Sequence, residues 1–252
     1  MIKKSIHFII ACVILFSSAC KKGDQGATGA TGPAGPTFTG AIAGHVSLYD
    51  SYGVRQLDGL NTVQLTLKGG ATATADVNGF FVFNKVTTGT YSISAAGNGL
   101  GATTVNNVNF LNDTTYQDIR LSELPNFDIS TFSSMYNTGS SNDSLIMTFP
   151  ADPKARNLII FVNDKLPVNN SPENYRLAYI KPIPTTWGAN TTMIFRVPEA
   201  DLSGVNIFYG EKVYYAVYSY VVNDASVYTD EATGKSVYTA VGAGLLDSTI
   251  AP

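Results

Sequence analysis

Few side chains in this sequence could do chemistry on a bound molecule. The 252 residues contain two cysteines, Cys12 and Cys20, and two histidines, His7 and His45. His7 lies in the N-terminal signal described below, which leaves His45 in the mature chain. A single histidine in the middle of a strand removes most histidine-based triads and most zinc sites, which need two or more imidazoles or thiolates. The chain also has no nucleophile elbow, phosphate-binding glycine loop or dinucleotide motif. The sequence therefore predicts no catalytic residue and no cofactor.

Three carboxylates close in sequence are the only candidates for a metal site. Asp224, Asp230 and Glu231 fall in what reads as one hairpin loop between strands. They could hold calcium, which prefers several oxygen ligands, but their spacing matches no known calcium loop, and we favour a solvated loop tip. A glycoside hydrolase could be built on two carboxylates, although nothing in the sequence singles out a pair.

Aromatic side chains are the candidates for ligand binding. Trp187 is the single tryptophan and lies in a loop or at a strand end. Tyr214, Tyr218 and Tyr220 share one face of a strand-like run over residues 212–222. Exposed, these rings could stack on a sugar or anchor a protein partner. The alternative is a set of core tyrosines whose hydroxyl groups are hydrogen-bonded within the fold.

The residues around Cys20 form a secretion signal. A basic start over residues 1–4 is followed by an apolar run from Ile6 to Phe16 and by the small residues Ser17, Ser18 and Ala19. The apolar run is too short to span a bilayer, which takes about 20 helical residues. Ordinary secretion, with cleavage before a free cysteine, is one reading of this pattern.

A cysteine directly after such a cleavage site resembles the lipobox of bacterial lipoproteins, although that family usually has Leu at the position of Ser17. The resemblance implies that residues 1–19 are removed and that Cys20 is acylated, with palmitate-like chains that hold the protein stably at a membrane. It also implies a place in the bacterial cell envelope, on the outer membrane, facing the periplasm or the cell surface. No cysteine would then remain to form a disulfide.

Charge excludes one large class of partners. Loss of Lys3 and Lys4 with the signal leaves 14 basic residues against 19 acidic ones, a net charge of −5. No cluster of Lys or Arg follows Lys21 and Lys22, and neutralising phosphates requires such clusters. We therefore expect no nucleic-acid partner.

Residues 20–38 read as an extended linker that carries the acylated cysteine. Five Gly-x-y triplets occupy residues 23–37, and Pro33 and Pro36 each follow a glycine, which resembles a collagen-like repeat. The repeat is short and lacks proline at the third position of the triplets, where it stabilises a triple helix most. We favour a monomer with a spacer on the order of 50 Å over a trimer joined by the stalk.

Residues 39–123 read as a first β-sandwich, because short alternating apolar and polar runs are bounded by Gly, Asn and Asp. The clearest pattern is Asp76-x-x-Gly79-x-Phe81-x-Phe83, followed by Gly89-x-Tyr91-x-Ile93. This pattern resembles the carboxypeptidase regulatory-like family. The resemblance implies a transthyretin-like sandwich with these aromatic and aliphatic side chains in its core. Such domains are usually accessory modules without catalysis, and some of them bind carbohydrate.

Residues 124–252 read as a second β-sandwich. Strand-like runs cover residues 144–149, 157–162, 175–180, 191–197, 212–222 and 236–241. One of these runs lies in the stretch Gly210-x-x-Val213-Tyr214-Tyr215-Ala216-Val217-Tyr218-Ser219-Tyr220. This stretch is similar to the penultimate strand of fibronectin type III-like domains of the immunoglobulin class. Both of its faces are apolar or aromatic, which predicts a central strand.

The sequence thus predicts an all-β protein with two tandem sandwiches after a signal peptide and a linker. We expect a lipid-anchored envelope protein that binds a glycan or another envelope protein without catalysis. Two alternatives stay open: a structural subunit that anchors a surface fibre or complex, and the carboxylate-based glycoside hydrolase.

Overall fold

The structure is a computed structural model that describes residues 37–251, except 138, 140 and 186–189. The predicted signal peptide, Cys20, nearly all of the predicted linker and Trp187 lie outside the described residues. Residues Thr37–Pro252 form one compact unit. Within it, the all-β class is confirmed: strands in antiparallel sheets dominate, and the described part contains one short α-helix, α2 (Glu199–Ser203).

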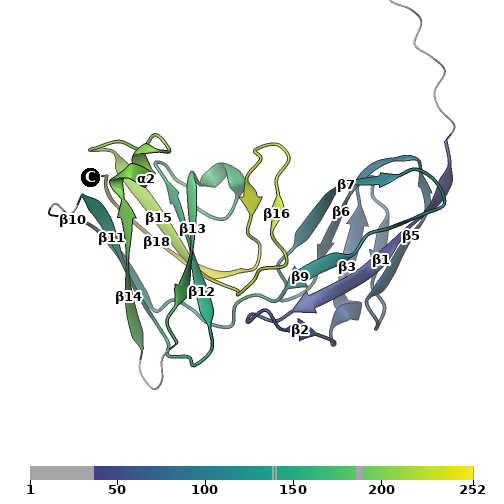
Figure 1. Ribbon diagram of the computed structural model, residues 1–252, viewed down its shortest axis with the longest axis horizontal. Helices are drawn as coiled ribbons and strands as arrows, with labels where there is room; N and C mark the ends of the chain where they lie inside the picture. Colours follow the sequence, from purple (N-terminus) through teal and green to yellow (C-terminus); the bar gives the residue numbers. More distant parts are fainter. Residues whose placement is uncertain (1–36, 138, 140, 186–189, 252) are drawn as a thin grey trace, which may run out of the picture. The chain divides into compact units, whose positions relative to one another are not determined.

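The first nine strands build two sheets (Figure 1). One sheet has the order β2-β1-β5, with β8 and β9 also paired to β1, and the other has the order β4-β3-β6-β7. The strands are β1 (Thr39–Tyr49), β2 (Arg55–Gln56), β3 (Gln64–Leu67), β4 (Thr72–Thr74), β5 (Phe80–Thr87), β6 (Gly89–Ala96), β7 (Thr103–Phe110), β8 (Thr114–Tyr116) and β9 (Ile119–Ser122).

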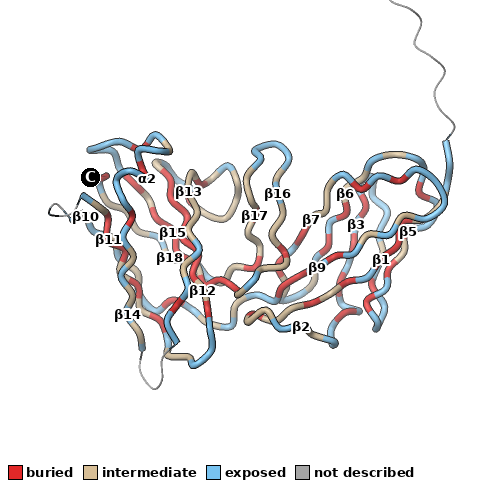
Figure 2. The backbone as a smooth tube through the Cα atoms, viewed as in Figure 1, coloured by how far each residue is buried: buried red, intermediate tan, exposed pale blue. Residues whose placement is uncertain are grey.

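The core of this sandwich follows the alternation expected from the sequence. Phe81, Phe83 and Ile93 are buried, and Tyr91 packs against the same cluster while its hydroxyl donates to the Thr87 carbonyl (2.8 Å). These positions alternate along β5 and β6, so one face of each strand points inward. Figure 2 shows buried positions alternating with more exposed ones along the strands.

The later strands form two more sheets, with the orders β10-β11-β14 and β13-β12-β15-β18, which face each other across a second core. A two-stranded hairpin, β16-β17, stands apart from them. The strands are β10 (Thr131–Asn137), β11 (Asn142–Phe149), β12 (Arg156–Asn163), β13 (Leu177–Ile183), β14 (Thr191–Pro198), β15 (Lys212–Tyr220), β16 (Tyr228–Thr229), β17 (Ser236–Val237) and β18 (Val241–Ile250).

β15 is a central strand, as its sequence predicted. It pairs with β12 on one side and β18 on the other. Val213, Tyr215 and Val217 point into the core between the two sheets. Ala216 and Tyr220, on the opposite face, join a third apolar cluster that also includes residues of the segments 168–175 and 238–241. Loops therefore cover part of the outer face of this sheet.

Two expectations about the last third of the chain were wrong. Residues 236–241 were expected to form one strand, but β17 ends at Val237 and β18 begins at Val241. Asp224 was expected in the same hairpin loop as Asp230, but it lies before β16, outside that hairpin. The sequence reading missed β18 because its glycines interrupt the apolar pattern.

Backbone and side-chain hydrogen bonds join β9 to the loop that follows β15. The Ser122 backbone N–H donates to the Ser226 hydroxyl (2.7 Å), and the Ala225 N–H donates to the Ser122 hydroxyl (2.9 Å). Both serines are fully buried. The Val222 N–H also donates to the Ser51 carbonyl (3.1 Å). These bonds hold the two sandwiches together at this point.

Residues 37–251, with the gaps named above, contain no helix that is both long and apolar enough to cross a bilayer.

Candidate binding site

A cavity of about 690 Å³ lies where β9 and the end of β1 meet the outer face of the β13-β12-β15-β18 sheet. Tyrosine rings and polar side chains line it together. The lining residues are Tyr49, Gly53, Arg120, Asn157, Ile180, Tyr220, Asn223, Asp224, Ala225, Val227 and Tyr238. A mostly apolar wall with a few convergent polar groups is typical of a small-ligand site.

Asp224 is held in place by groups of the protein itself. Its Oδ2 accepts a hydrogen bond from the Tyr220 hydroxyl (3.1 Å), and its Oδ1 accepts one from the Ser226 backbone N–H (2.7 Å). Donors on Ala240 and Ser122 also act on this carboxyl group. The carboxylate is therefore a structural acceptor that fixes the loop along the wall of the cavity.

Burial raises the pKa values of both Asp224 and Tyr220. Desolvation raises the pKa of Asp224 above its ordinary value, although the hydrogen bonds from Ser226 and Tyr220 oppose that rise. Desolvation, together with the negative charge of Asp224, raises the pKa of the Tyr220 hydroxyl, which therefore stays protonated as a donor. The two groups form a fixed hydrogen bond rather than an acid–base pair open to a substrate.

Arg120 is the positively charged side chain in the wall of the cavity. It lies on β9 between Ile119 and Leu121, which are fully buried, so its side chain points away from the core. Within the described residues, the salt bridges are Arg156–Asp152 and Arg176–Asp164. Arg120 is in neither of them, and the residue is exposed.

The tyrosines on the outer face of β15 divide into two kinds. Tyr220 is 3% exposed and lines the cavity. Tyr218 is half-buried, packs edge-on against Phe161 (5.7 Å between ring centroids) and lies over Gly244. Tyr214 is half-buried, with the Lys212 ammonium 5.0 Å from its ring centroid. Of these three predicted ligand-binding residues, Tyr220 alone lines the cavity.

The three predicted carboxylates do not come together. Asp224 lines the cavity, whereas Asp230 caps the β16-β17 turn, where its Oδ1 accepts from the backbone N–H (2.8 Å) and the hydroxyl (2.7 Å) of Thr233. Glu231 is exposed on that turn. Across the described ranges, no group of three or more His, Cys, Asp or Glu side chains is placed to hold a metal ion.

Sequence reasoning missed most of the cavity. Tyr49, Arg120, Asn223 and Tyr238 come from different elements that are distant in the chain. The signal that was present is the outward position of Arg120 between two buried residues, but an exposed arginine on a strand is common. Only the approach of the two sandwiches makes these side chains neighbours.

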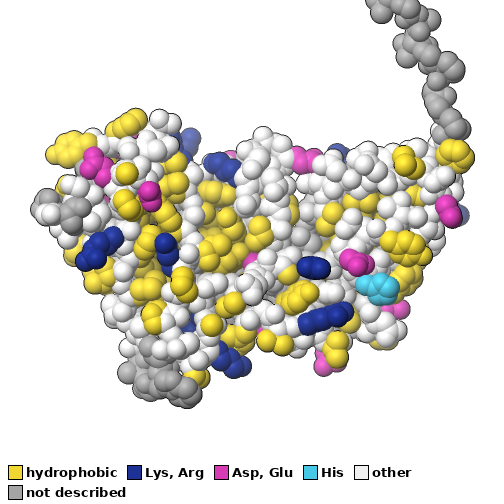
Figure 3. Space-filling view, in the orientation of Figure 1, with side chains coloured by type: hydrophobic (Ala, Val, Ile, Leu, Met, Phe, Trp, Pro, Cys, Tyr) yellow, Lys and Arg dark blue, Asp and Glu magenta, His cyan; other side chains and the backbone are white. Residues whose placement is uncertain are grey.

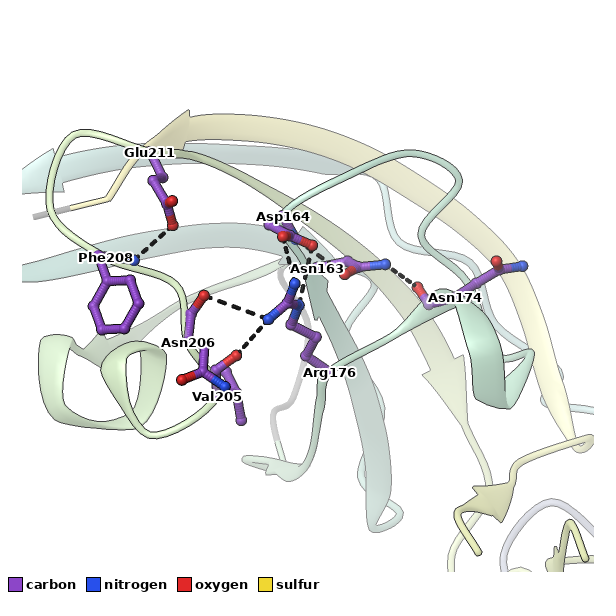
Figure 4. Close-up of polar contacts among 8 residues, drawn as sticks. All are labelled: Asn163, Asp164, Asn174, Arg176, Val205, Asn206, Phe208 and Glu211. Atoms are coloured by element: carbon purple, nitrogen blue, oxygen red, sulfur yellow. Dashed lines mark hydrogen bonds and ion pairs between the residues drawn. The ribbon is translucent and has the colours of Figure 1, made fainter. Parts of the chain in front are cut away.

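A second polar cluster orders the loop over residues 204–211 (Figure 4). Arg176 donates from Nε and Nη2 to the two carboxylate oxygens of Asp164 (3.0 and 2.5 Å) and from Nη1 to the Val205 carbonyl (2.7 Å). Glu211 accepts from the Phe208 N–H through its Oε2 (2.8 Å). One guanidinium group therefore ties this loop to the end of β12.

This loop presents two exposed aromatic rings. The Glu211 N–H donates to the Phe208 carbonyl (3.0 Å), and Gly210 has φ +83°, which matches a type II turn. Tyr209, at the corner of that turn, is 81% exposed, and Phe208 is 53% exposed. The two rings are exposed because the hydrogen bonds of the turn hold the backbone in this conformation.

The face drawn in Figure 3 shows Lys and Arg side chains scattered among polar and apolar atoms, without a continuous basic patch.

No family model matches the chain, and no curated protein sequence matches it. Among solved structures, it is similar to a Bacteroides uniformis protein described as a proposed carbohydrate binding protein, with 12% identity, 83% of this chain and 98% of that chain covered, and a TM-score of 0.28.

It is also similar to DUF3823 family proteins from Parabacteroides merdae (13% identity, TM-score 0.26) and Bacteroides ovatus (14% identity, TM-score 0.30). Each of these two alignments covers 82% of this chain and 98% of the other. Because all three TM-scores are 0.30 or lower, these likenesses assign neither a family nor a ligand to this chain.

Proposed function

We propose that this chain is a non-catalytic binding protein that takes a glycan in the cavity beside Arg120. The observation that carries the proposal is the composition of that cavity, in which tyrosines 49, 220 and 238 stand with Arg120 and two asparagines around about 690 Å³. This volume falls in the range of small-ligand sites, about 300–1,000 Å³. The one carboxylate in the wall is occupied by internal hydrogen bonds.

The chemistry of a sugar fits such a wall. A pyranose has apolar C–H faces that pack on aromatic rings, and hydroxyl groups that exchange hydrogen bonds with amides and guanidinium groups. Asn157 and Asn223 supply amides, and Tyr49 and Tyr238 supply rings with hydroxyl groups. Binding by these groups needs no proton transfer, in keeping with a site that offers no free acid–base pair.

The test compares two tyrosine truncations. A glycan array finds ligands for the folded domain, and titration calorimetry then measures their affinity for wild type, Tyr49→Ala and Tyr209→Ala. Tyr49 lines the cavity, whereas Tyr209 is exposed on a loop that does not. We expect Tyr49→Ala to weaken binding about tenfold, or about 1.4 kcal/mol, and Tyr209→Ala to leave it unchanged. The absence of any glycan ligand would refute the proposal.

We further propose that the protein is anchored in the bacterial envelope through acylated Cys20. The support is the sequence alone: a secretion signal that ends directly before this cysteine, and a glycine-rich linker after it. Mass spectrometry of the intact protein from the membrane fraction tests this. Wild type should lack residues 1–19 and carry the mass of the acyl chains. Cys20→Ala should carry no lipid and leave the membrane fraction, and a wild type without lipid mass contradicts the proposal.

Contact with another envelope protein is a second candidate function. The ordered turn that exposes Phe208 and Tyr209 favours it, because rigid exposed aromatic residues anchor protein interfaces. Capture experiments from envelope extracts should then lose one specific partner with Tyr209→Ala and keep it with Tyr49→Ala. The reverse pattern would place the contact at the cavity.

A further inference from the structure

We propose that the glycan bound in this cavity is an acidic sugar, whose anionic group pairs with the guanidinium of Arg120. This inference rests on the proposed function and names the ligand class of the same site. It starts from the balance of charge in the cavity wall, where one arginine and one aspartate face the same space.

The hydrogen-bonding capacity of the one carboxylate in the wall is already used by neutral groups of the protein. Both carboxylate oxygens of Asp224 accept hydrogen bonds, one from the Tyr220 hydroxyl (3.1 Å) and one from the Ser226 N–H (2.7 Å). Desolvation raises the pKa of this carboxyl group above its ordinary value, although the hydrogen bonds oppose that rise. Because the oxygens of Asp224 are already used within the protein, Arg120 is the charged side chain of the wall that is left to pair with a ligand.

The positive charge of Arg120 forms no salt bridge with a carboxylate of the described residues. Arg120 belongs to neither of the salt bridges among the described residues. Its neighbours on β9, Ile119 and Leu121, are fully buried, so the strand fixes the direction in which the arginine side chain leaves the sheet. A guanidinium group carries five N–H donors and no acceptor. A ligand that satisfies these donors must bring acceptors, and preferably a negative charge.

The planar fork of an arginine side chain matches a carboxylate with two parallel hydrogen bonds. Uronic and sialic acids bring such a carboxylate on a ring whose C–H face can pack against the tyrosines of the wall. Sulfated sugars bring an anion of different geometry. The shared chemistry is an anionic group on a sugar ring, and the experiment separates the two sources.

The experiment measures binding of the folded domain, by calorimetry, to trigalacturonic acid, to its neutral counterpart galactotriose and to a sulfated galactose oligosaccharide, after a glycan array with uronic, sialic, sulfated and neutral members. The variants are Arg120→Gln and Arg196→Gln; Arg196 is exposed on β14 and does not line the cavity. Arg120→Gln keeps hydrogen-bonding capacity but removes the charge.

Acidic glycans should bind wild type at least tenfold more tightly than neutral ones, and this preference should be lost in Arg120→Gln and kept in Arg196→Gln. Preference for uronic or sialic members assigns the carboxylate; preference for sulfated members assigns the sulfate. Neutral glycans that bind as well as acidic ones overturn this inference and leave the proposed function standing, as does an acidic preference that survives Arg120→Gln. Failure of every glycan overturns both.

Discussion

At the scale of single residues, Asp143 is the group whose burial has the clearest consequence. Its side chain is fully buried in the second sandwich, where the Tyr215 hydroxyl donates to one carboxylate oxygen. The other oxygen has no hydrogen-bond partner among the residues that the structure describes. Desolvation raises the pKa of Asp143 from 3.8 to about 6, and the hydrogen bond from Tyr215 opposes part of that rise. Between about pH 4 and pH 6, the folded protein therefore holds a proton on Asp143 that the unfolded chain has already released.

The sign of the pH dependence follows from this difference. Because the folded state binds the proton more tightly, the contribution of Asp143 to stability is fully present below about pH 4 and is lost as the pH rises through about 6. The loss is at most about 3 kcal/mol. In Asp143→Asn, where the amide oxygen can still accept from Tyr215, we expect this decline to disappear. Urea unfolding at pH values from 4 to 8 measures it.

Asp128→Asn is the control, because Asp128 is exposed just before the same sandwich. It should keep the wild-type pH profile. A profile of Asp143→Asn that runs parallel to the wild type would show that this carboxyl group does not carry the pH dependence.

At the scale of elements, β1 pairs with more strands than any other strand of the first sandwich. It pairs with β5 in antiparallel fashion and with β8 and β9 in parallel. Gly44 lies where β1 passes the segment between β8 and β9, and a Cβ atom there would stand 1.9 Å from the backbone oxygen of Gln117. Backbone cannot move aside as a side chain can, so this crossing requires glycine.

Gly44→Ala should therefore lower the free energy of unfolding by at least about 2 kcal/mol. Gly89→Ala serves as a matched substitution, because the nearest atom to its new Cβ is a side-chain carbon of Tyr91 at 3.4 Å. We expect a change of less than about 0.5 kcal/mol there. Urea denaturation compares the two variants, and equal effects would argue against the close crossing at Gly44.

The loop over residues 204–211 is ordered by Arg176, and its mobility should depend on that side chain. Lysine cannot reproduce the pair of bonds to Asp164 while also reaching the Val205 carbonyl. In Arg176→Lys, we expect the amides of Phe208 and Gly210 to exchange with deuterium about tenfold faster, and in Arg196→Lys at the wild-type rate. Unchanged exchange in Arg176→Lys would mean that Glu211 and the backbone hydrogen bonds to Ala251 hold the turn without Arg176.

Strands β5, β6 and β18 differ in how well the sequence alone predicted them. Alternating apolar residues predicted the inner faces of β5 and β6, because in those strands the local pattern and the burial agree. β18 was missed, since Gly244 breaks its pattern. That glycine is explained only by the Tyr218 ring, which lies where a Cβ would be. The cavity was missed because Arg120 and Tyr238 meet through folding and not through any local spacing.

At the scale of the whole molecule, the buried pair Ser122 and Ser226 is one of the contacts that join the two sandwiches. The Ser122 backbone N–H donates to the Ser226 hydroxyl, and the Ser122 hydroxyl accepts from Ala225. Val222 adds a backbone bond to Ser51 at the same junction. The loop at this junction also lines the cavity, so the cavity exists only while the two sandwiches stay in contact.

Removing the Ser226 hydroxyl should uncouple the unfolding of the two sandwiches. In Ser226→Ala, the buried Ser122 N–H loses its acceptor, which costs about 1–3 kcal/mol, whereas Ser130→Ala, at an exposed serine, should cost little. Hydrogen exchange in increasing urea follows peptides from residues 39–122 and 131–250 separately. We expect both sets to open together in wild type and Ser130→Ala, and at different urea concentrations in Ser226→Ala. Opening at different concentrations already in wild type would show that the junction does not couple the cores, and the cavity would then lose its fixed wall.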